Sequence, residues 1–290
     1  MSFAWVLNLD AELELSRLNF GYVSRTKLLS QLETHGQGSR ALLGPDDLLI
    51  EPGAVAPPSG YLGRAWCPTP LALGRLSALG IPAEPHPEAS VLRRVNHRLF
   101  AHQAGAGLPL QQYFTERAPL AELLRRAERP WLLKRPLAFA GRGQMRFYGP
   151  ISDKQWSWLD VSLARDGLIV EPLVTPTLEL SLHGFVWQAG HYELGRVCVQ
   201  QVSERGVFRG VRLATADELD PAESTSLFEQ AARVAGLLHG AGYFGPFGID
   251  AYRYQLDAQR GFCALSEINA RYTMGFAIGF PRPTAQLSLA

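Results

Sequence analysis

The first ninety residues alternate between short apolar runs and segments in which apolar residues recur at helical spacing. Segments rich in Pro and Gly, at residues 51–60 and 80–87, end the regular elements. Strands are predicted at residues 5–9 and 47–51, and helices at residues 24–34 and 70–79. Strands that alternate with helices in this way predict a small α/β lobe over residues 1–88.

Beyond residue 88 the pattern changes from alternating elements to groups of neighbouring strands. The predicted helices cover residues 91–104, 119–126, 152–163 and 221–241. The predicted strands cover residues 131–136, 145–148 and 168–172, antiparallel strands between 179 and 212, and a closing pair at 247–254 and 261–269. In this part of the chain the predicted helices and the antiparallel strands fall in separate groups.

Composition excludes several classes of protein. The chain of 290 residues is 47% apolar with a formal net charge of +1, which excludes a disordered chain and argues against a nucleic-acid partner. It has no apolar run of about 18 residues, so no membrane span is expected, and no signal peptide opens it. Cys67, Cys198 and Cys263 are too far apart for a zinc site or a disulfide framework. A reducing cytoplasm is the expected location.

The closing strand pair carries a cluster of oxygen-bearing side chains. Asp250 lies on one strand, and Glu267 and Asn269 lie two apart on the other, so the latter two share a face. Carboxylates with an amide oxygen are hard ligands that suit Mg²⁺ together with phosphate. Arg271 keeps the same face if the strand continues, beside a phosphoryl group or a carboxylate. The alternative is a polar strand face turned to solvent.

Lys134 ends the apolar run 131–133 and leads into a loop that contains Gly141 and Gly143. Only three of the 28 basic residues are lysines, so a lysine kept at the end of an apolar strand is notable. A nucleotide phosphate would pair with it, and the backbone N–H groups of a glycine loop can close over phosphates. The alternative is an edge-strand lysine beside an ordinary hairpin turn.

A second acidic position follows the apolar strand at 168–170. Glu171 precedes a proline, where a segment can cross between lobes, and Glu179 follows after a short interval. Either carboxylate could accept a hydrogen bond from a base amino group or from a ribose hydroxyl. The alternative for each is a loop acid facing solvent.

These features follow one another along the chain, from the lysine and glycine loop through the Glu-Pro strand and the antiparallel strands to Gly-Ile-Asp250 and Glu267-Ile-Asn-Ala-Arg271. In this order they resemble the ATP-grasp superfamily over residues 91–280. The resemblance is to its D-alanine–D-alanine ligase-like and biotin-carboxylase-like members. It implies an α/β N-terminal domain over residues 1–88, followed over 89–290 by two α+β subdomains that clasp ATP between antiparallel sheets. Residues at about 130–172 would form the mobile lid.

The resemblance also implies roles for individual residues. Lys134 would bind the ATP phosphates, Arg271 would contact the acyl phosphate or the substrate carboxylate, and Glu179 would hold the ribose. Arg98 is the candidate for a second basic phosphate ligand, with His97 a weaker one. The implied phosphate loop is Ala140, Gly141, Arg142, Gly143 and Gln144, the implied adenine segment is Glu171, Pro172, Leu173 and Val174, and the implied metal ligands are Asp250, Glu267 and Asn269.

The function that follows is an ATP-dependent carboxylate–amine ligase that forms an amide through an acyl phosphate. Its cofactors would be ATP and two Mg²⁺ ions, with Mn²⁺ as a substitute, and its partners a small-molecule carboxylic acid and an amine. A homodimer is compatible with this assignment. The alternatives are a kinase-like phosphotransferase of the same fold and a non-catalytic nucleotide-binding module.

Overall fold

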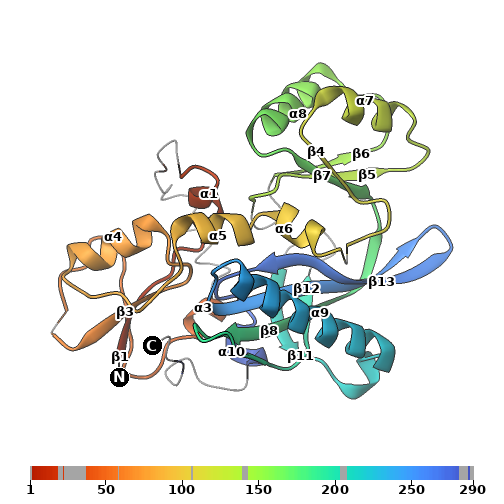
Figure 1. The fold of residues 1–290 in the computed structure, drawn as a ribbon. Helices are drawn as coiled ribbons and strands as arrows, with labels where there is room; N and C mark the ends of the chain where they lie inside the picture. The colour runs from red at the N-terminus through yellow and green to blue at the C-terminus, as the bar shows by residue number, and fades with distance from the viewer. Residues whose placement is uncertain are drawn as a thin grey trace.

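The computed structural model describes residues 2–18, 22, 37–57, 59–105, 107–138, 143–202, 208–280 and 287. Within these residues the strands form sheets of three, four and six strands, and the four-stranded sheet stands above the rest in Figure 1. No helix in the described part of the chain combines the length and apolar character needed to cross a membrane. Mixed helices and antiparallel sheets confirm the predicted α+β class.

The N-terminal sheet is parallel, with the order β2-β1-β3. Its strands are β1 (Ser2–Val6), β2 (Leu48–Leu49) and β3 (Tyr61–Ala65), and its helices are α1 (Ala11–Leu15), α3 (Gln37–Arg40) and α4 (Pro70–Ala78). The first strand begins three residues before its predicted start, and β3 was not predicted. Arg64 gives the sequence of β3 a polar residue where a buried strand would be apolar. A salt bridge to Glu84 at 2.7 Å nevertheless allows the Arg64 side chain to be buried. The helix predicted at 24–34 lies outside the described residues.

The helix predicted at 91–104 is in fact two helices, α5 (Ala89–Val95) and α6 (Arg98–Gln103). The Asn96 side chain donates to the Leu92 carbonyl at 2.9 Å and accepts from the Ala270 backbone at 2.9 Å. His97 caps the next helix, since its Nδ1 accepts from the Leu99 backbone N–H at 3.2 Å. The break places Arg98 at the start of a new helix.

The four-stranded sheet has the order β4-β7-β5-β6, and all of its pairings are antiparallel. Its strands are β4 (Gln112–Phe114), β5 (Trp131–Lys134), β6 (Gln144–Phe147) and β7 (Leu168–Pro172), and its helices are α7 (Arg117–Arg125) and α8 (Asp153–Arg165). Leu120 and Leu159 of the helices pack against Leu133 and Val170 of the strands in a separate core. The three-residue strand β4 was missed because it is too short to show a period.

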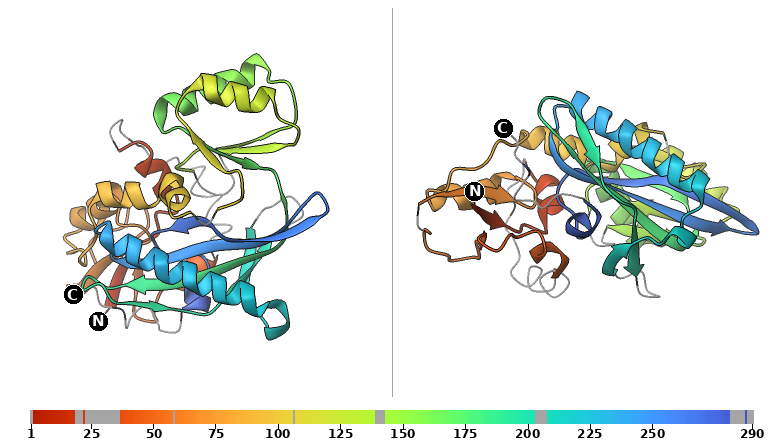
Figure 2. Two further views of the ribbon diagram at one scale, coloured as in Figure 1. Left: turned by 45° about the vertical axis from the view of Figure 1, so that its right-hand side comes forward. Right: turned by 90° about the horizontal axis from the view of Figure 1, so that it is seen from below.

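The six-stranded sheet has the order β11-β10-β8-β12-β13, with β9 paired to β8. Its strands are β8 (Thr175–Val186), β9 (Tyr192–Leu194), β10 (Cys198–Val202), β11 (Phe208–Leu213), β12 (Gly245–Leu256) and β13 (Gln259–Asn269). The helix α9 (Pro221–Gly240) lies along one face (Figure 2), and the short helices η1 (Ala216–Glu218) and α10 (Phe276–Gly279) complete the described elements. Strand alternation turns Ile249 and Ala251 into the core under α9, which leaves Asp250 on the opposite face.

The largest buried cluster joins the six-stranded sheet to the N-terminal sheet. Phe3 and Trp5 belong to the same cluster as Leu182, Tyr272 and Phe276. The Trp5 and Tyr272 rings lie 5.1 Å apart. This shared core fixes the N-terminal sheet against the C-terminal end of β13, while the predicted boundary at residue 88 stays a prediction.

Candidate active site

The hairpin of β12 and β13 brings the predicted metal ligands together. Asp250 is paired with Glu267, and Gly248 with Asn269, so the three polar side chains lie on neighbouring positions of one face. The Asn269 amide donates to one Asp250 oxygen at 3.0 Å. The Gln200 amide of β10 donates to the other at 2.7 Å. Gln200 was missed because no motif marks a single glutamine on a strand.

Within the described residues, Asp250 has no cationic hydrogen-bond partner. Burial, and then the neighbouring Glu267 charge, raise the pKa of the Asp250 carboxyl to about 7, although its two amide partners act in the opposite direction. Asp250, Glu267 and Asn269 offer two carboxylates and one amide oxygen. The described residues contain no group of three or more His, Cys, Asp or Glu side chains arranged for a metal, so the amide is needed to complete this set.

Arg98 connects the hairpin to the four-stranded sheet. Its Nη2 donates to the Glu267 carboxylate at 2.8 Å, and its Nη1 donates to the backbone carbonyl of Arg135 at 2.6 Å. The side chain is 7% exposed, and its Nε has no hydrogen-bond partner in the described part of the chain. A buried guanidinium N–H without a partner is costly, and it marks a position where an anionic oxygen can bind.

Lys134 forms an ion pair with Glu171 on the neighbouring strand β7. Both side chains are largely buried, with 12% and 3% of their surface exposed. The Gln111 amide donates to the second Glu171 oxygen at 2.6 Å. These groups, together with Arg98, line an open cavity between the two sheets. Gln111 is a further residue that sequence reasoning missed.

Other predicted site residues lie on or beside strands β6, β7 and β8. Leu173 and Val174 lie in the short link from β7 to β8, and the backbone N–H of Leu173 donates to the Pro130 carbonyl at 2.9 Å. Glu179 lies on β8, opposite Tyr252 of β12, and burial raises the pKa of the Glu179 carboxyl. The remaining residues assigned to the adenine segment and the phosphate loop are Pro172, which ends β7, Gly143, which has a φ of +69°, and Gln144, which opens β6.

Ala140, Gly141 and Arg142 lie outside the described residues.

Arg271 lies just beyond β13, because that strand ends at Asn269 and does not continue as the prediction assumed. Its Nη2 still reaches the Asn269 side-chain oxygen, at 3.0 Å, and its guanidinium pairs with Glu12 of α1. Glu12 is 5% exposed, and its second oxygen has no partner within the described residues. The N-terminal part of the chain thus supplies a buried carboxylate to the site. The only sign of Glu12 in the sequence was an acidic residue within an apolar stretch.

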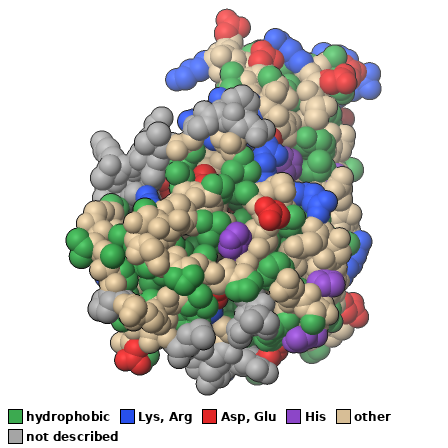
Figure 3. Space-filling model, turned by 60° about the vertical axis from the view of Figure 1, so that its left-hand side comes forward, with side chains coloured by type: hydrophobic (Ala, Val, Ile, Leu, Met, Phe, Trp, Pro, Cys, Tyr) green, Lys and Arg blue, Asp and Glu red, His purple; other side chains and the backbone are tan. Residues whose placement is uncertain are grey.

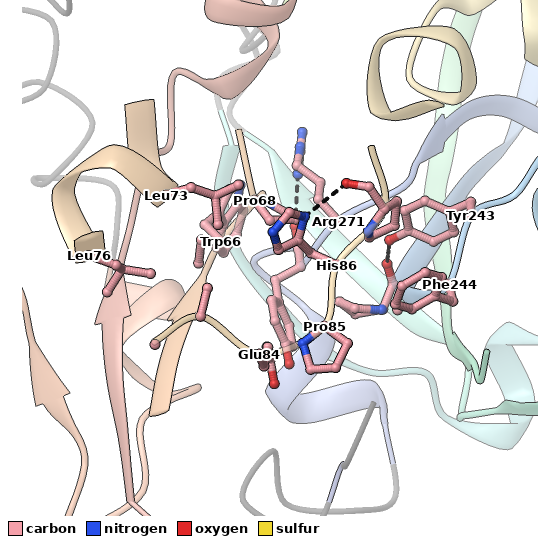
Figure 4. A pocket seen from close by; sticks show the side chains of 17 residues that line it. Trp66, Pro68, Leu73, Leu76, Glu84, Pro85, His86, Tyr243, Phe244 and Arg271 are labelled. Carbon is pink, nitrogen blue, oxygen red and sulfur yellow. Dashed lines mark hydrogen bonds between the residues drawn. The ribbon is translucent and has the colours of Figure 1, made fainter. Parts of the chain in front are cut away.

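A second open cavity borders Arg271 (Figure 4). Trp66 and Leu73 lie on one side of it, Tyr243 and Phe244 lie on the other, and His86 lies between them. Its lining is mostly apolar. On the face that Figure 3 shows, side chains of both charge signs are interspersed, and no single-sign patch of the kind that binds nucleic acid is visible there.

No protein-family profile and no curated protein sequence matches the chain. Solved structures do match. The chain superposes on N5-carboxyaminoimidazole ribonucleotide synthetase from Thermus thermophilus with a TM-score of 0.52 at 20% identity, covering 93% of this chain and 72% of that one. The carboxyaminoimidazole ribonucleotide synthase of Aspergillus clavatus, solved with ATP, matches with a TM-score of 0.53 at 17% identity, covering 100% of this chain and 80% of that one.

D-alanine–D-alanine ligase from Bacillus anthracis matches with a TM-score of 0.53 at 13% identity, covering 100% of this chain and 93% of that one. Identities this low establish the fold alone. The chain therefore adopts the ATP-grasp fold, and the resemblance deduced from its motifs is confirmed at that level.

Proposed function

We propose that this chain is an ATP-dependent carboxylate–amine ligase that acts on small molecules through an acyl-phosphate intermediate. The structural neighbours support the reaction class, since their names describe synthetases and a ligase, and one was solved with ATP. The substrates of this chain are a carboxylic acid and an amine of unassigned identity.

The observation that carries the proposal is the position of Arg98. It lies between a carboxylate of the hairpin and the backbone at the end of β5, and it retains one buried N–H without a partner in the described residues. Lys134 lies on the wall of the same cavity. Two buried cations beside a pair of carboxylates suit a triphosphate whose charge is shared between protein and metal.

The residues of the hairpin fit Mg²⁺ as the proposed cofactor. Asp250 and Glu267 would supply carboxylate oxygens and Asn269 its amide oxygen, which are hard ligands of the kind that Mg²⁺ and Mn²⁺ accept. The lack of a cationic hydrogen-bond partner at Asp250 among the described residues agrees with this role. Bound there, two ions would neutralise charge on the phosphate oxygens.

The proposed reaction has two steps. A carboxylate oxygen of the acid attacks the γ-phosphorus of ATP, which breaks the bond to the β-phosphate oxygen and gives an acyl phosphate and ADP. The amine nitrogen then attacks the acyl carbon, the bond to phosphate breaks, and the nitrogen loses a proton. Lys134 and Arg98 would hold the phosphates. Arg271, which donates to the Asn269 side chain, would stabilise the negative charge of the acyl phosphate.

The proposal also assigns roles to larger segments. Residues 1–88 would form the N-terminal domain that contributes Glu12, and residues 89–290 the ATP-grasp domain. The four-stranded sheet at about 130–172 would act as a lid that excludes water from the acyl phosphate. The adenine would lie against Glu171 to Val174 and the ribose against Glu179, with the 140–144 loop over the phosphates.

Binding of Mg-ATP tests the proposal. Calorimetry on the wild type should show Mg²⁺-dependent binding, and Lys134→Ala and Glu267→Ala should weaken it by about a hundredfold each. The exposed residues Lys154 and Glu229 provide matched controls, Lys154→Ala and Glu229→Ala. Binding that is unchanged in both site variants would overturn the assignment.

A panel of carboxylic acids and amines then separates the proposed ligase from its alternatives. ADP release together with a new amide, identified by mass spectrometry, supports the ligase. A stable phosphate ester would indicate the kinase-like phosphotransferase. Binding of ATP without release of ADP across the panel would indicate a nucleotide-binding module.

A further inference from the structure

Gln111 lies in the segment between α6 and β4, and no motif assigns it a role. Its amide nitrogen donates to Glu171 at 2.6 Å, and its amide oxygen lies 2.8 Å from Nδ1 of His102. All three side chains line the cavity that Lys134 and Arg98 share. A buried carboxylate, an amide and an imidazole therefore form a continuous chain of hydrogen bonds at the proposed nucleotide site.

The chemistry of the partners sets the direction of this chain. An ionised Glu171 can only accept hydrogen bonds, so the amide must present its NH₂ group to it. The Gln111 oxygen then faces His102, which donates from Nδ1 and carries its hydrogen there. The reversed amide would place its oxygen against the carboxylate, which is repulsive. Each group thus holds its neighbour in a single orientation.

Gly107 leaves room for the Gln111 amide. A Cβ placed on Gly107 would lie 2.6 Å from the side-chain oxygen of Gln111 and 3.0 Å from the side-chain carbon that carries this oxygen. A contact this short forces one group to move, and the Gln111 amide is the end of a flexible side chain, so a side chain at 107 would displace the amide from its observed position. This observation is independent of the hydrogen bonds and identifies the same group.

We propose that Gln111 is a positioning residue of the nucleotide site. Oriented by His102 and accommodated by Gly107, its amide fixes one oxygen of Glu171, so that the other oxygen holds the Lys134 ammonium at the cavity wall where a phosphate would bind. The inference rests on the proposed function, because it assumes that a nucleotide occupies this cavity.

The test is a double-mutant cycle on Mg-ATP binding measured by calorimetry. Gln111→Met keeps the side-chain length but removes the donor, and it should raise the Kd by about tenfold. In a Glu171→Gln background the same substitution should change the Kd by less than about twofold, because the group it positions has lost its charge. The exposed neighbour Gln112 supplies the matched control, Gln112→Met, with wild-type binding.

Two further variants test the same geometry by other routes. Gly107→Ala should displace the amide and weaken binding to a similar degree. His102→Leu should weaken binding, and His102→Asn, which retains an N–H donor, should restore part of it. A purely structural role would instead lower the melting temperature of these variants without changing the Kd of the folded protein.

Equal losses in both backgrounds of the cycle, or wild-type binding by Gln111→Met, would overturn this inference. Should Gln111→Met fail to fold, wild-type binding by Gly107→Ala and His102→Leu would overturn it equally. A wild-type protein that does not bind Mg-ATP would instead overturn the proposed function, so the two failures are distinguishable.

Discussion

Two carboxylates near the proposed nucleotide site are treated differently by their surroundings. Glu171, on strand β7 of the four-stranded sheet, is bonded to the Lys134 ammonium and to the Gln111 amide. Asp250, on the hairpin, accepts hydrogen bonds from the amides of Gln200 and Asn269 and, among the described residues, from no cationic side chain. The first carboxylate forms an ion pair within the protein itself, whereas the second is hydrogen-bonded only to neutral groups in this part of the chain.

This difference separates a structural charge from one reserved for a ligand. A buried ion pair is balanced before any ligand arrives. A buried carboxylate served only by neutral donors stays costly, and burial accordingly raises the pKa of Asp250 to about 7. Asp250 can recover this cost by binding a cation, so substitutions at the two positions should affect stability in opposite directions.

The largest expected effect is on function at the hairpin. Asp250→Asn removes the carboxylate but keeps its size, and should lower kcat/KM for ATP on the order of a thousandfold, as expected for the loss of a preorganised charge-stabilising group. The effect is measured by ADP release with the best substrate pair, over a range of Mg²⁺ concentrations. The exposed Glu229→Gln variant is the control. Activity within a few-fold of wild type would show that Asp250 holds no metal.

The second prediction compares stability at the two carboxylates. Glu171→Gln leaves the largely buried Lys134 without its counter-ion and should lower the free energy of unfolding by about 3 kcal/mol. Asp250→Asn removes an uncompensated buried charge and should raise it by about 1 kcal/mol at pH 8. Urea unfolding without Mg²⁺ measures both. Losses of equal size would contradict the distinction between the two sites.

Histidines extend the comparison to pH. His183 is buried on β8, opposite Gly248 of the hairpin, with Nδ1 3.0 Å from the Thr273 hydroxyl, and burial lowers the pKa of its imidazole to about 4. Below pH 6.5 an unfolded chain binds a proton at this histidine that the folded chain excludes. Stability is therefore present above pH 6.5 and is lost toward pH 4, by at most about 1.4 kcal/mol per pH unit.

Substitution isolates this contribution. His183→Gln cannot titrate, so the difference in unfolding free energy between it and the wild type should vary between pH 6.5 and 4 and stay constant above that range. Burial also lowers the pKa of His97 to about 4, but His97 is present in both proteins and cancels in the difference. A difference that does not vary with pH would show that His183 is protonated in the folded state.

Periodicity predicted the elements that are long or strongly patterned. The helix predicted at 221–241 and the closing strand pair correspond to α9 and to the hairpin of β12 and β13. Periodicity failed where side-chain chemistry overrides the apolar pattern. Asn96 and His97 break a helix through hydrogen bonds that no window average detects, and Arg64 is buried in β3 because a distant glutamate pairs with it.

The candidate site was predictable only where one motif contains its members. Glu267 and Asn269 share a strand, so their common face follows from their spacing. Other partners reach the site from separate elements. Gln200 comes from β10, Gln111 from the loop before β4, and Glu12 from α1. Their contacts depend on how separate elements pack, which local sequence does not encode. These partners of the site therefore had to come from the structure.

The smallest predicted effect concerns Gln200, which should tune the hairpin site without forming it. Its amide donates to Asp250 at 2.7 Å and restrains one carboxylate oxygen. Gln200→Leu should raise the Mg²⁺ concentration needed for half-maximal ATP binding by about tenfold, as is typical when a partner of a metal ligand is lost. Calorimetric titrations of ATP at fixed Mg²⁺ concentrations measure this shift.

The exposed neighbour Gln201 provides the matched control, Gln201→Leu, which should need wild-type Mg²⁺. At saturating Mg²⁺ the Gln200→Leu variant should bind ATP as the wild type does, because the ligands themselves remain. A deficit that persists at saturation would place Gln200 in contact with the nucleotide. An unchanged Mg²⁺ requirement would mean that the Asn269 amide alone is sufficient to orient Asp250, which would reduce the outer support of the hairpin site to a single hydrogen bond.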